Sequence, residues 1–208
     1  MDEIKKQLSI SYEEQFDMEE LSERRLWINE EICNELVGII VFHIMRYNRE
    51  DTGKPKEDRK PIYLYINTPG GDVTAGYSLI DAITNSATPV YTVNLADCAS
   101  MGFLVFIAGH KRFSFPHSRF LMHDGATAGW DSTAKMKDRM MFETIQVEEM
   151  TKQYVISHTN ISDELYDEKY RIEWYFLPEE AKKYGIVDEI VGITCSMDDI
   201  CGVYKKAG

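Results

Sequence analysis

The sequence predicts an α/β fold in which most strands pair in parallel. Segments with the two-residue alternation of strands take turns with segments of helical periodicity along nearly the whole chain. A glycine pair in "NTPGG" stands directly between the first clear strand and a helix, where the backbone must turn sharply. With 208 residues, 44% of them apolar, the chain is long enough for one domain with a sizeable core.

The first half of the chain begins with a polar and charged segment, 1–24, and the ordered domain is expected to start at residue 25. The segment 33–48 has apolar residues at helical spacing and predicts a helix packed on the core. Nine of the twelve residues in 49–60 are charged, which predicts a solvated loop. The strand "PIYLYI" then places apolar residues on one face and two tyrosines on the other, namely Ile62, Leu64 and Ile66 against Tyr63 and Tyr65.

The second half continues the alternation of helices and strands. A long helix is expected over about 132–158, begun by Asp131 or Ser132. Pro178 suits the first turn of a closing helix, and Gly185 suits its end. The remaining predicted elements, in chain order, are a helix over 73–86, a strand over 89–95, a buried helix after Ser100, strands over 112–115 and 119–122, a helix over 162–170 and a strand over 186–191.

Charge and cysteine content exclude several classes of function. The net charge of −12 disfavours nucleic acid and anionic membranes as partners, because phosphate groups are bound by clustered Lys and Arg. The four cysteines form no CxxC pair, so we expect a reducing compartment, no disulfide framework, no bound metal and no cofactor. Residues 1–24 lack the apolar core of a signal peptide, and no apolar run reaches the length of a bilayer span, so a cytoplasmic protein is expected.

Two turns could carry chemistry. Gly70 and Gly71 either form a plain strand-to-helix turn or bring bare N–H groups to a ligand, but they match neither a phosphate-binding nor a dinucleotide-binding loop. Ser100 opens a buried helix, where the usual role of a serine is to cap the helix N-terminus. The unpaired N–H groups at that helix start could equally stabilise a negative oxygen beside the serine.

A histidine and an acid complete the set of candidates. His123 ends the strand "RFLM", and strand ends in α/β proteins face clefts. Glu173 lies among Ile172, Trp174 and other apolar residues, so its carboxylate either needs a partner such as a histidine or points to water from an edge strand.

These residues, in this order, resemble the ClpP family of serine peptidases from about Arg25 to Ile190. The similarity is carried by "IYLYINTPGGDVTAGYSLIDAI", "CASMGFLVFIAGHKRFSFPHSRFLMHD" and "EEAKKYGIVDEI". It implies the ClpP/crotonase-like fold of repeated β-β-α units, with a protruding handle helix at about 132–158. The domain would span 25–191, followed by a tail, 192–208, that has no counterpart in the family.

The resemblance implies a role for each candidate residue. Ser100 would be the nucleophile and His123 the general base, while the N–H groups of Gly71 and Met101 would form the oxyanion hole. Glu173 would be the third member of the triad, although the family usually has Asp at that position. Asp167 is a fallback acid that falls on a predicted helix.

The resemblance also implies partners. Members of the family form heptameric rings that pair as tetradecamers, enclose the serines and receive unfolded polypeptides from an AAA+ unfoldase. Tyr63 and Tyr65 match positions that line the docking pocket for that unfoldase, and their other interpretation is packing of a strand face.

Two alternatives to an active endopeptidase stay open. One is a ring subunit of the same fold with little or no activity, which the substitution at Glu173 permits. The other is an acyl-CoA enzyme of the crotonase type, which would need neither the Ser–His pair nor the closing motif.

Overall fold

The computed structural model describes residues 11–126 and 130–202, and it has the expected α/β architecture. Seven strands form one sheet in the order β1-β2-β3-β4-β7, with β5 beside β3 and β6 beside β5. Every pairing is parallel except that of β5 with β6, so the predicted parallel sheet is confirmed. The strands are β1 (Arg25–Ile28), β2 (Ile62–Thr68), β3 (Val90–Ala99), β4 (Lys111–Ser114), β5 (Arg119–Met122), β6 (Trp174–Phe176) and β7 (Glu189–Ile190).

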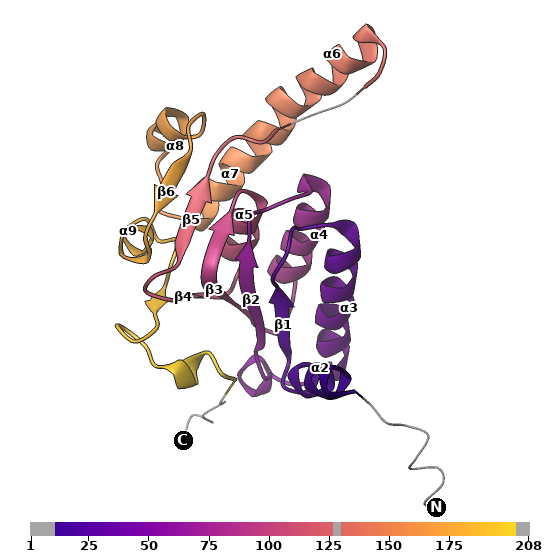
Figure 1. The fold of residues 1–208 in the computed structure, drawn as a ribbon, viewed down its shortest axis with the longest axis vertical. Coiled ribbons are helices and arrows are strands. Elements are labelled where there is room, and N and C mark those ends of the chain that lie inside the picture. The colour runs from indigo at the N-terminus through magenta and orange to yellow at the C-terminus, as the bar shows by residue number, and fades with distance from the viewer. Residues whose placement is uncertain (1–10, 127–129, 203–208) are drawn as a thin grey trace, which may run out of the picture.

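Most helices pack against one face of this sheet, and one pair projects away from it. The helical rod formed by α6 and α7 extends well beyond the sheet (Figure 1). The helices are α2 (Tyr12–Ser22), α3 (Asn34–Glu50), α4 (Val73–Thr84), α5 (Met101–Ile107), α6 (Thr133–Phe142), α7 (Glu148–His158), α8 (Asp163–Lys169) and α9 (Pro178–Lys183), with short 3₁₀ turns η1 (Lys56–Asp58) and η3 (Met197–Asp199).

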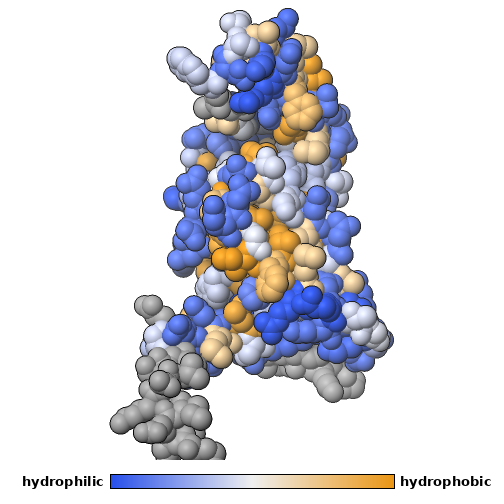
Figure 2. Space-filling model, turned by 90° about the vertical axis from the view of Figure 1, so that its right-hand side faces the viewer, coloured by the Kyte–Doolittle hydropathy of each residue, from blue (hydrophilic) through white to orange (hydrophobic). Residues whose placement is uncertain are grey.

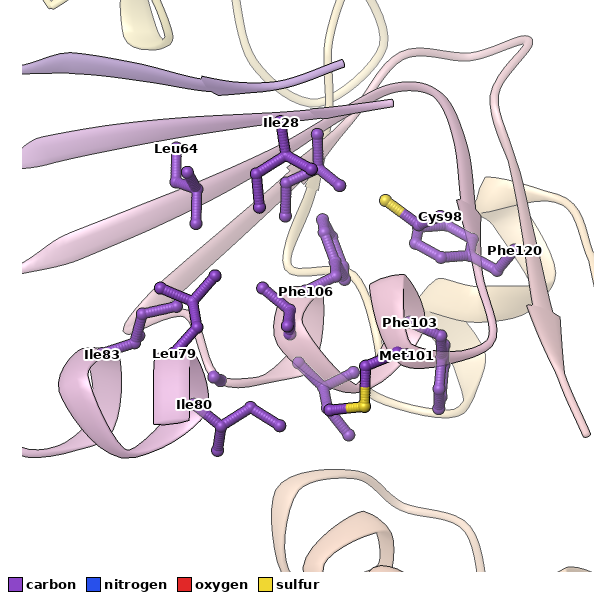
Figure 3. Close-up of a cluster of buried hydrophobic side chains, with 14 of the residues drawn as sticks. Ile28, Leu64, Leu79, Ile80, Ile83, Cys98, Met101, Phe103, Phe106 and Phe120 are labelled. Carbon is purple, nitrogen blue, oxygen red and sulfur yellow. The ribbon is translucent and has the colours of Figure 1, made fainter. Parts of the chain in front are cut away.

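The alternation in β2 separates two apolar clusters. Ile62, Leu64 and Ile66 face the main core, where they meet residues of α3, α4 and α5. Figure 3 shows Leu79 and Ile83 of α4 directed toward the strands in this core. Tyr63 and Tyr65 lie on the opposite face, in a second cluster. This cluster includes Val191 and Ile200 from the C-terminal segment, residues 191–202.

The charged segment 49–60 is only partly the solvated loop that composition predicts. Asp51 is fully buried and binds the Arg24 guanidinium, with Oδ1 3.0 Å from Nη2. Lys54 and the Thr88 hydroxyl also donate to this carboxylate. The loop is therefore anchored at its start by an ion pair to Arg24, a residue distant in the sequence.

Strand β3 is longer than predicted because it changes partners along its length. Its first part pairs with β4, and residues 97–99 pair with β5. Asp97 forms an ion pair with Arg119 of β5, with Oδ2 2.9 Å from Nη2. This polar residue can therefore continue the strand. As a result β3 runs to the residue before Ser100.

The expected long helix is present but is not uniformly α-helical. Helix α6 passes into a π-helical segment, η2 (Glu143–Val147), which passes into α7. Helix α6 buries none of its residues. The rod therefore begins close to the predicted residue 132 and ends at His158, with one wider turn in the middle.

Candidate active site

Ser100 occupies a sharp turn between β3 and α5. Its backbone has φ 55° and ψ −122°, a conformation that L-residues rarely adopt. Its N–H donates to the Leu121 carbonyl of β5 at 2.9 Å, and α5 begins at the next residue. The side chain makes no capping hydrogen bond, so the capping role expected on local grounds is wrong. Ser100 is thus a strained serine at a strand-to-helix turn, and its hydroxyl bonds to none of the described residues.

The glycine pair packs against this turn. Gly70 has φ 107° and Gly71 has φ 146°, so both have backbones that favour glycine. A Cβ on Gly70 would lie 2.7 Å from the Cβ of Ser100. A Cβ on Gly71 would collide with the backbone of Ile32. The glycines are therefore required for the close approach of two backbones at this site.

Two N–H groups are available beside the serine. Ile32 N–H donates to the Gly70 carbonyl, and Asp72 N–H donates to the Ile32 carbonyl, so the bridge between Ile32 and Gly71 does not use the Gly71 N–H. Met101 is the first residue of α5, where N–H groups have no partner within a helix. Within residues 11–126 and 130–202, neither the Gly71 nor the Met101 N–H donates to a protein acceptor.

His123 follows the last residue of β5 and shares a cavity with Ser100. The cavity has a volume of about 100 Å³, and both residues are among those that line it. Strands β3 and β5 are parallel neighbours, so their ends bring the serine and the histidine to the same edge of the sheet. Neither the Ser100 hydroxyl nor the His123 ring forms a hydrogen bond with another of the described residues. The structure thus places the two in one cavity without a direct bond between them.

Glu173 lies immediately before β6, and its carboxylate is bound elsewhere. Strand β6 pairs antiparallel with β5 up to Met122 opposite Trp174, so continuing the register brings Glu173 opposite His123. The exposed Glu173 side chain accepts a hydrogen bond from the Tyr175 hydroxyl at 2.9 Å. Asp167, the fallback acid, binds Lys152 at 2.7 Å and does not line the cavity. The backbone therefore positions Glu173 near the histidine, while its side chain is bonded to Tyr175.

Part of the cavity wall was not predicted from the sequence. The helical rod contributes Glu143, Val147, Glu148, Thr151 and Val155 to it. Val147, Thr151 and Val155 recur every four residues, which is one face of an α-helix. This spacing was the available signal that one side of the rod faces the site.

Comparisons with known proteins show the family to which the chain belongs. The Clp protease family model matches residues 13–194, which is most of the chain and includes Ser100, His123 and Glu173. The chain belongs to the Clp protease family. It is similar to the ATP-dependent Clp protease proteolytic subunit 3 of Synechococcus sp. (strain CC9605), with 31% identity over 174 residues, 81% of this chain and 82% of that protein. The family resemblance drawn from the sequence is confirmed, and it indicates a ClpP-like peptidase.

The two tyrosines that were expected to line a docking pocket are covered in this structure. Tyr63 and Tyr65 are each 5% exposed. Their hydroxyl groups donate to the carbonyls of Asp199 and Ile200 in the C-terminal segment. Burial raises the pKa of Tyr63 to about 12 and also raises the pKa of Tyr65. The family match ends at residue 194, so the segment that covers these rings lies largely outside it.

Neither a metal-binding cluster nor a membrane-spanning helix is found in the described part of the chain. No group of three or more His, Cys, Asp or Glu residues within it could hold a metal ion. None of its helices combines the length and the apolar character needed to cross a bilayer.

Proposed function

We propose that this chain is a serine endopeptidase that hydrolyses peptide bonds in unfolded polypeptides. Ser100 is the nucleophile, His123 the general base, and the N–H groups of Gly71 and Met101 form the oxyanion hole. The observation that carries the proposal is the strained Ser100 turn, whose hydroxyl bonds to none of the described residues and shares a cavity with His123. A crotonase-type reaction would not need this pair, so the endopeptidase is the better match.

The reaction follows from these positions. The Ser100 Oγ attacks the scissile carbonyl carbon while its proton passes to His123. The carbonyl oxygen becomes negative and accepts hydrogen bonds from Gly71 and Met101, each such donor typically being worth about 10²–10³-fold in rate. The carbon–nitrogen bond then breaks, and the leaving amine takes the proton from His123. A water molecule repeats the sequence on the acyl-enzyme and releases the carboxylic acid.

Glu173 is the third member of the proposed triad. A carboxylate facing His123 would hold the imidazole in its reactive orientation and stabilise its charged form. The contact to Tyr175 favours a second candidate, a ring subunit with weak or no activity, because the carboxylate is engaged away from the histidine. The two candidates differ in whether substrate binding turns Glu173 toward His123.

The proposed assembly is a homo-oligomeric ring, a heptamer or a tetradecamer, with the serines inside. Its support is exposed apolar surface, which is uncommon on monomers when it forms contiguous patches. Figure 2 shows apolar side chains gathered on the face that carries α3, where Ile39, Phe42 and Met45 are more than half exposed. The rod, the proposed handle, adds further exposed apolar residues, including Met140, Met141, Phe142 and Ile145.

The proposed context is the cytoplasm, where an AAA+ unfoldase would supply the substrate. The expectation of a reducing compartment comes from the cysteine spacing, which has no CxxC pair. Docking of an unfoldase at Tyr63 and Tyr65 would require the C-terminal segment to leave their rings.

Peptide hydrolysis by matched serine variants tests the function. We expect the purified protein to cleave a fluorogenic peptide and Ser100→Ala to abolish cleavage. Ser132→Ala is the control, because Ser132 also precedes a helix, is exposed and makes no capping hydrogen bond through its side chain. Native mass spectrometry tests the assembly, since fourteen copies of 24.1 kDa total about 337 kDa. Cleavage that survives Ser100→Ala would refute the assignment, and an assembled wild type without cleavage would support the inactive subunit.

A further inference from the structure

The cavity beside Ser100 has an apolar floor. Its apolar lining comes from the sheet side and from the rod, and consists of Val73, Met101, Phe103, Leu104, Met122, Val147 and Val155. Tyr166 and Tyr170, whose rings stack with centroids 5.6 Å apart, form another wall. Such a surface accommodates the methylene stem of a long side chain.

All the charged side chains that line the cavity, His123 aside, are acidic. Asp124, Glu143 and Glu148 line the cavity, and no lysine or arginine is among the described residues that do so. Acidic side chains on a surface are usually only solvated. Here they border the cavity that contains the proposed nucleophile, so a substrate side chain entering it must meet them.

The π-helical segment explains how both glutamates reach the cavity. Glu143 and Glu148 are five residues apart, and in an α-helix they would point about 140° away from each other. A π-helical turn bonds residue i to residue i+5 and brings such a pair toward one face. The segment η2 spans Glu143 to Val147, so the wider turn lies between these carboxylates. π-Turns inside α-helices are frequent at functional sites.

The nearby cations already have partners among the described residues. Lys152 binds Asp163 at 3.0 Å and Asp167 at 2.7 Å. Arg171 donates to the Tyr170 hydroxyl at 2.6 Å, and its guanidinium lies 5.2 Å from that ring. Both cations line a neighbouring hollow and not this cavity. Glu148 and Asp124 each have an electrostatic interaction with Arg171 without forming an ion pair, and Glu143 has no ion pair within the described residues.

We propose that Glu143 and Glu148 make this peptidase selective for lysine or arginine at the substrate residue whose carbonyl is attacked. The stem of that side chain would lie on the apolar floor, and its cation would reach the two carboxylates. Charge-assisted hydrogen bonds to half-buried carboxylates are stronger than neutral ones. The net charge of −12 adds a long-range attraction for basic segments. The inference rests on the proposed function and names a substrate class for it.

Three peptides that differ only at that residue test the selectivity. They carry lysine, methionine, which has similar length without charge, or glutamate. We expect kcat/KM to be about tenfold higher for lysine than for methionine, the ratio that a gain of 1.4 kcal/mol produces, and lowest for glutamate. The lysine-to-methionine ratio should fall as salt is added, because screening weakens the charge interaction.

Variants assign the effect to the two glutamates. The double variant Glu143→Gln/Glu148→Gln should bring the lysine-to-methionine ratio close to 1. Arg171→Gln should raise the ratio, because it removes the cation that competes for Glu148. Glu149→Gln is the matched control, since Glu149 is exposed on the same helix, binds Gln153 and does not line the cavity.

Each outcome decides the matter. Equal or faster cleavage of the methionine peptide overturns the selectivity while leaving the peptidase intact. A lysine preference that persists in the double variant also overturns it, because other residues would then provide the preference. If none of the three peptides is cleaved, both the proposed function and the selectivity are contradicted.

Discussion

Gly70 packs so closely against Ser100 that a Cβ at position 70 would lie 2.7 Å from the Cβ of the serine and 2.8 Å from the Ala99 carbonyl oxygen. The backbone of Gly70 also has φ 107°. The serine turn and the glycine turn are therefore formed together, and the position of the hydroxyl depends on the absence of a side chain opposite it.

Substitution of Gly70 should disturb the active site as well as strain the backbone. Gly70→Ala is expected to destabilise the protein and to abolish peptide cleavage, because Ser100 must shift. Gly53→Ala is the matched control: Gly53 also has a positive φ, but a Cβ there would meet nothing within 4 Å. Gly53→Ala should cost about 1–2 kcal/mol of unfolding free energy and leave cleavage intact. Denaturant unfolding and peptide assays check both, and an active Gly70→Ala enzyme would contradict the packing argument.

The buried Asp51 carboxylate should govern stability at acidic pH. Burial raises its pKa, but hydrogen bonds from Arg24, Lys54 and Thr88 outweigh burial and hold that pKa well below its usual range. The pKa of an aspartate in the unfolded chain is about 4. The stabilisation that ionised Asp51 gives to the folded state is therefore fully present above about pH 4, and it is lost as the pH falls toward the pKa of Asp51 in the folded state.

Replacing Asp51 tests this linkage. Asp51→Asn should cost about 3–5 kcal/mol of unfolding free energy at neutral pH, since it leaves the Arg24 cation without its main partner. The loss should shrink as the pH falls below 4, as followed by denaturant unfolding at a series of pH values. The same change at the exposed Asp138 should have little effect. A loss for Asp51→Asn that is independent of pH would contradict the ionised state of this carboxylate.

The Ile200 side chain should anchor the C-terminal segment against Tyr63 and Tyr65. Its side chain is 2% exposed in the cluster of Tyr63 and Tyr65, whereas Ile193 in the same segment is 59% exposed. Ile200→Ala is expected to cost about 2–3 kcal/mol, and Ile193→Ala less than about 0.5 kcal/mol. Unfolding free energies measure the difference, and equal values would show that the segment does not pack on the tyrosines.

Glu173 should contribute through the histidine. Glu173→Gln is expected to lower kcat about 10²–10⁴-fold, because an amide does not stabilise the charged imidazole. Tyr175→Phe removes the competing hydroxyl and should preserve or raise the rate. Steady-state assays over a range of pH check both variants. A Glu173→Gln enzyme with the wild-type rate would remove Glu173 from the triad.

Local patterns predicted much of this fold, while features that depend on distant partners were missed. The alternation in β2 correctly separated Ile62, Leu64 and Ile66 from Tyr63 and Tyr65, because strand periodicity directly sets which face a side chain occupies. Composition could not show that Asp51 is buried, since its partner Arg24 lies far away in the sequence. The extension of β3 to Ala99 likewise depends on pairing with β5.

The candidate site shows the same division. The sequence correctly placed Ser100 at a helix start and His123 at a strand end. It could not show that the serine hydroxyl is free of a capping bond, because that depends on the strained backbone beside Gly70. The acidic wall was also missed, since helical spacing separates Glu143 from Glu148 unless the turn between them is π-helical.

The most direct test of the account is covalent labelling with a fluorophosphonate, followed by mapping of the modified residue by mass spectrometry. We expect a single modified serine, Ser100, in the assembled wild type. We also expect His123→Ala to slow the labelling strongly, because the base no longer takes the serine proton. Modification of another serine in place of Ser100, or labelling of Ser100 at the same rate in His123→Ala, would contradict the proposed catalytic pair.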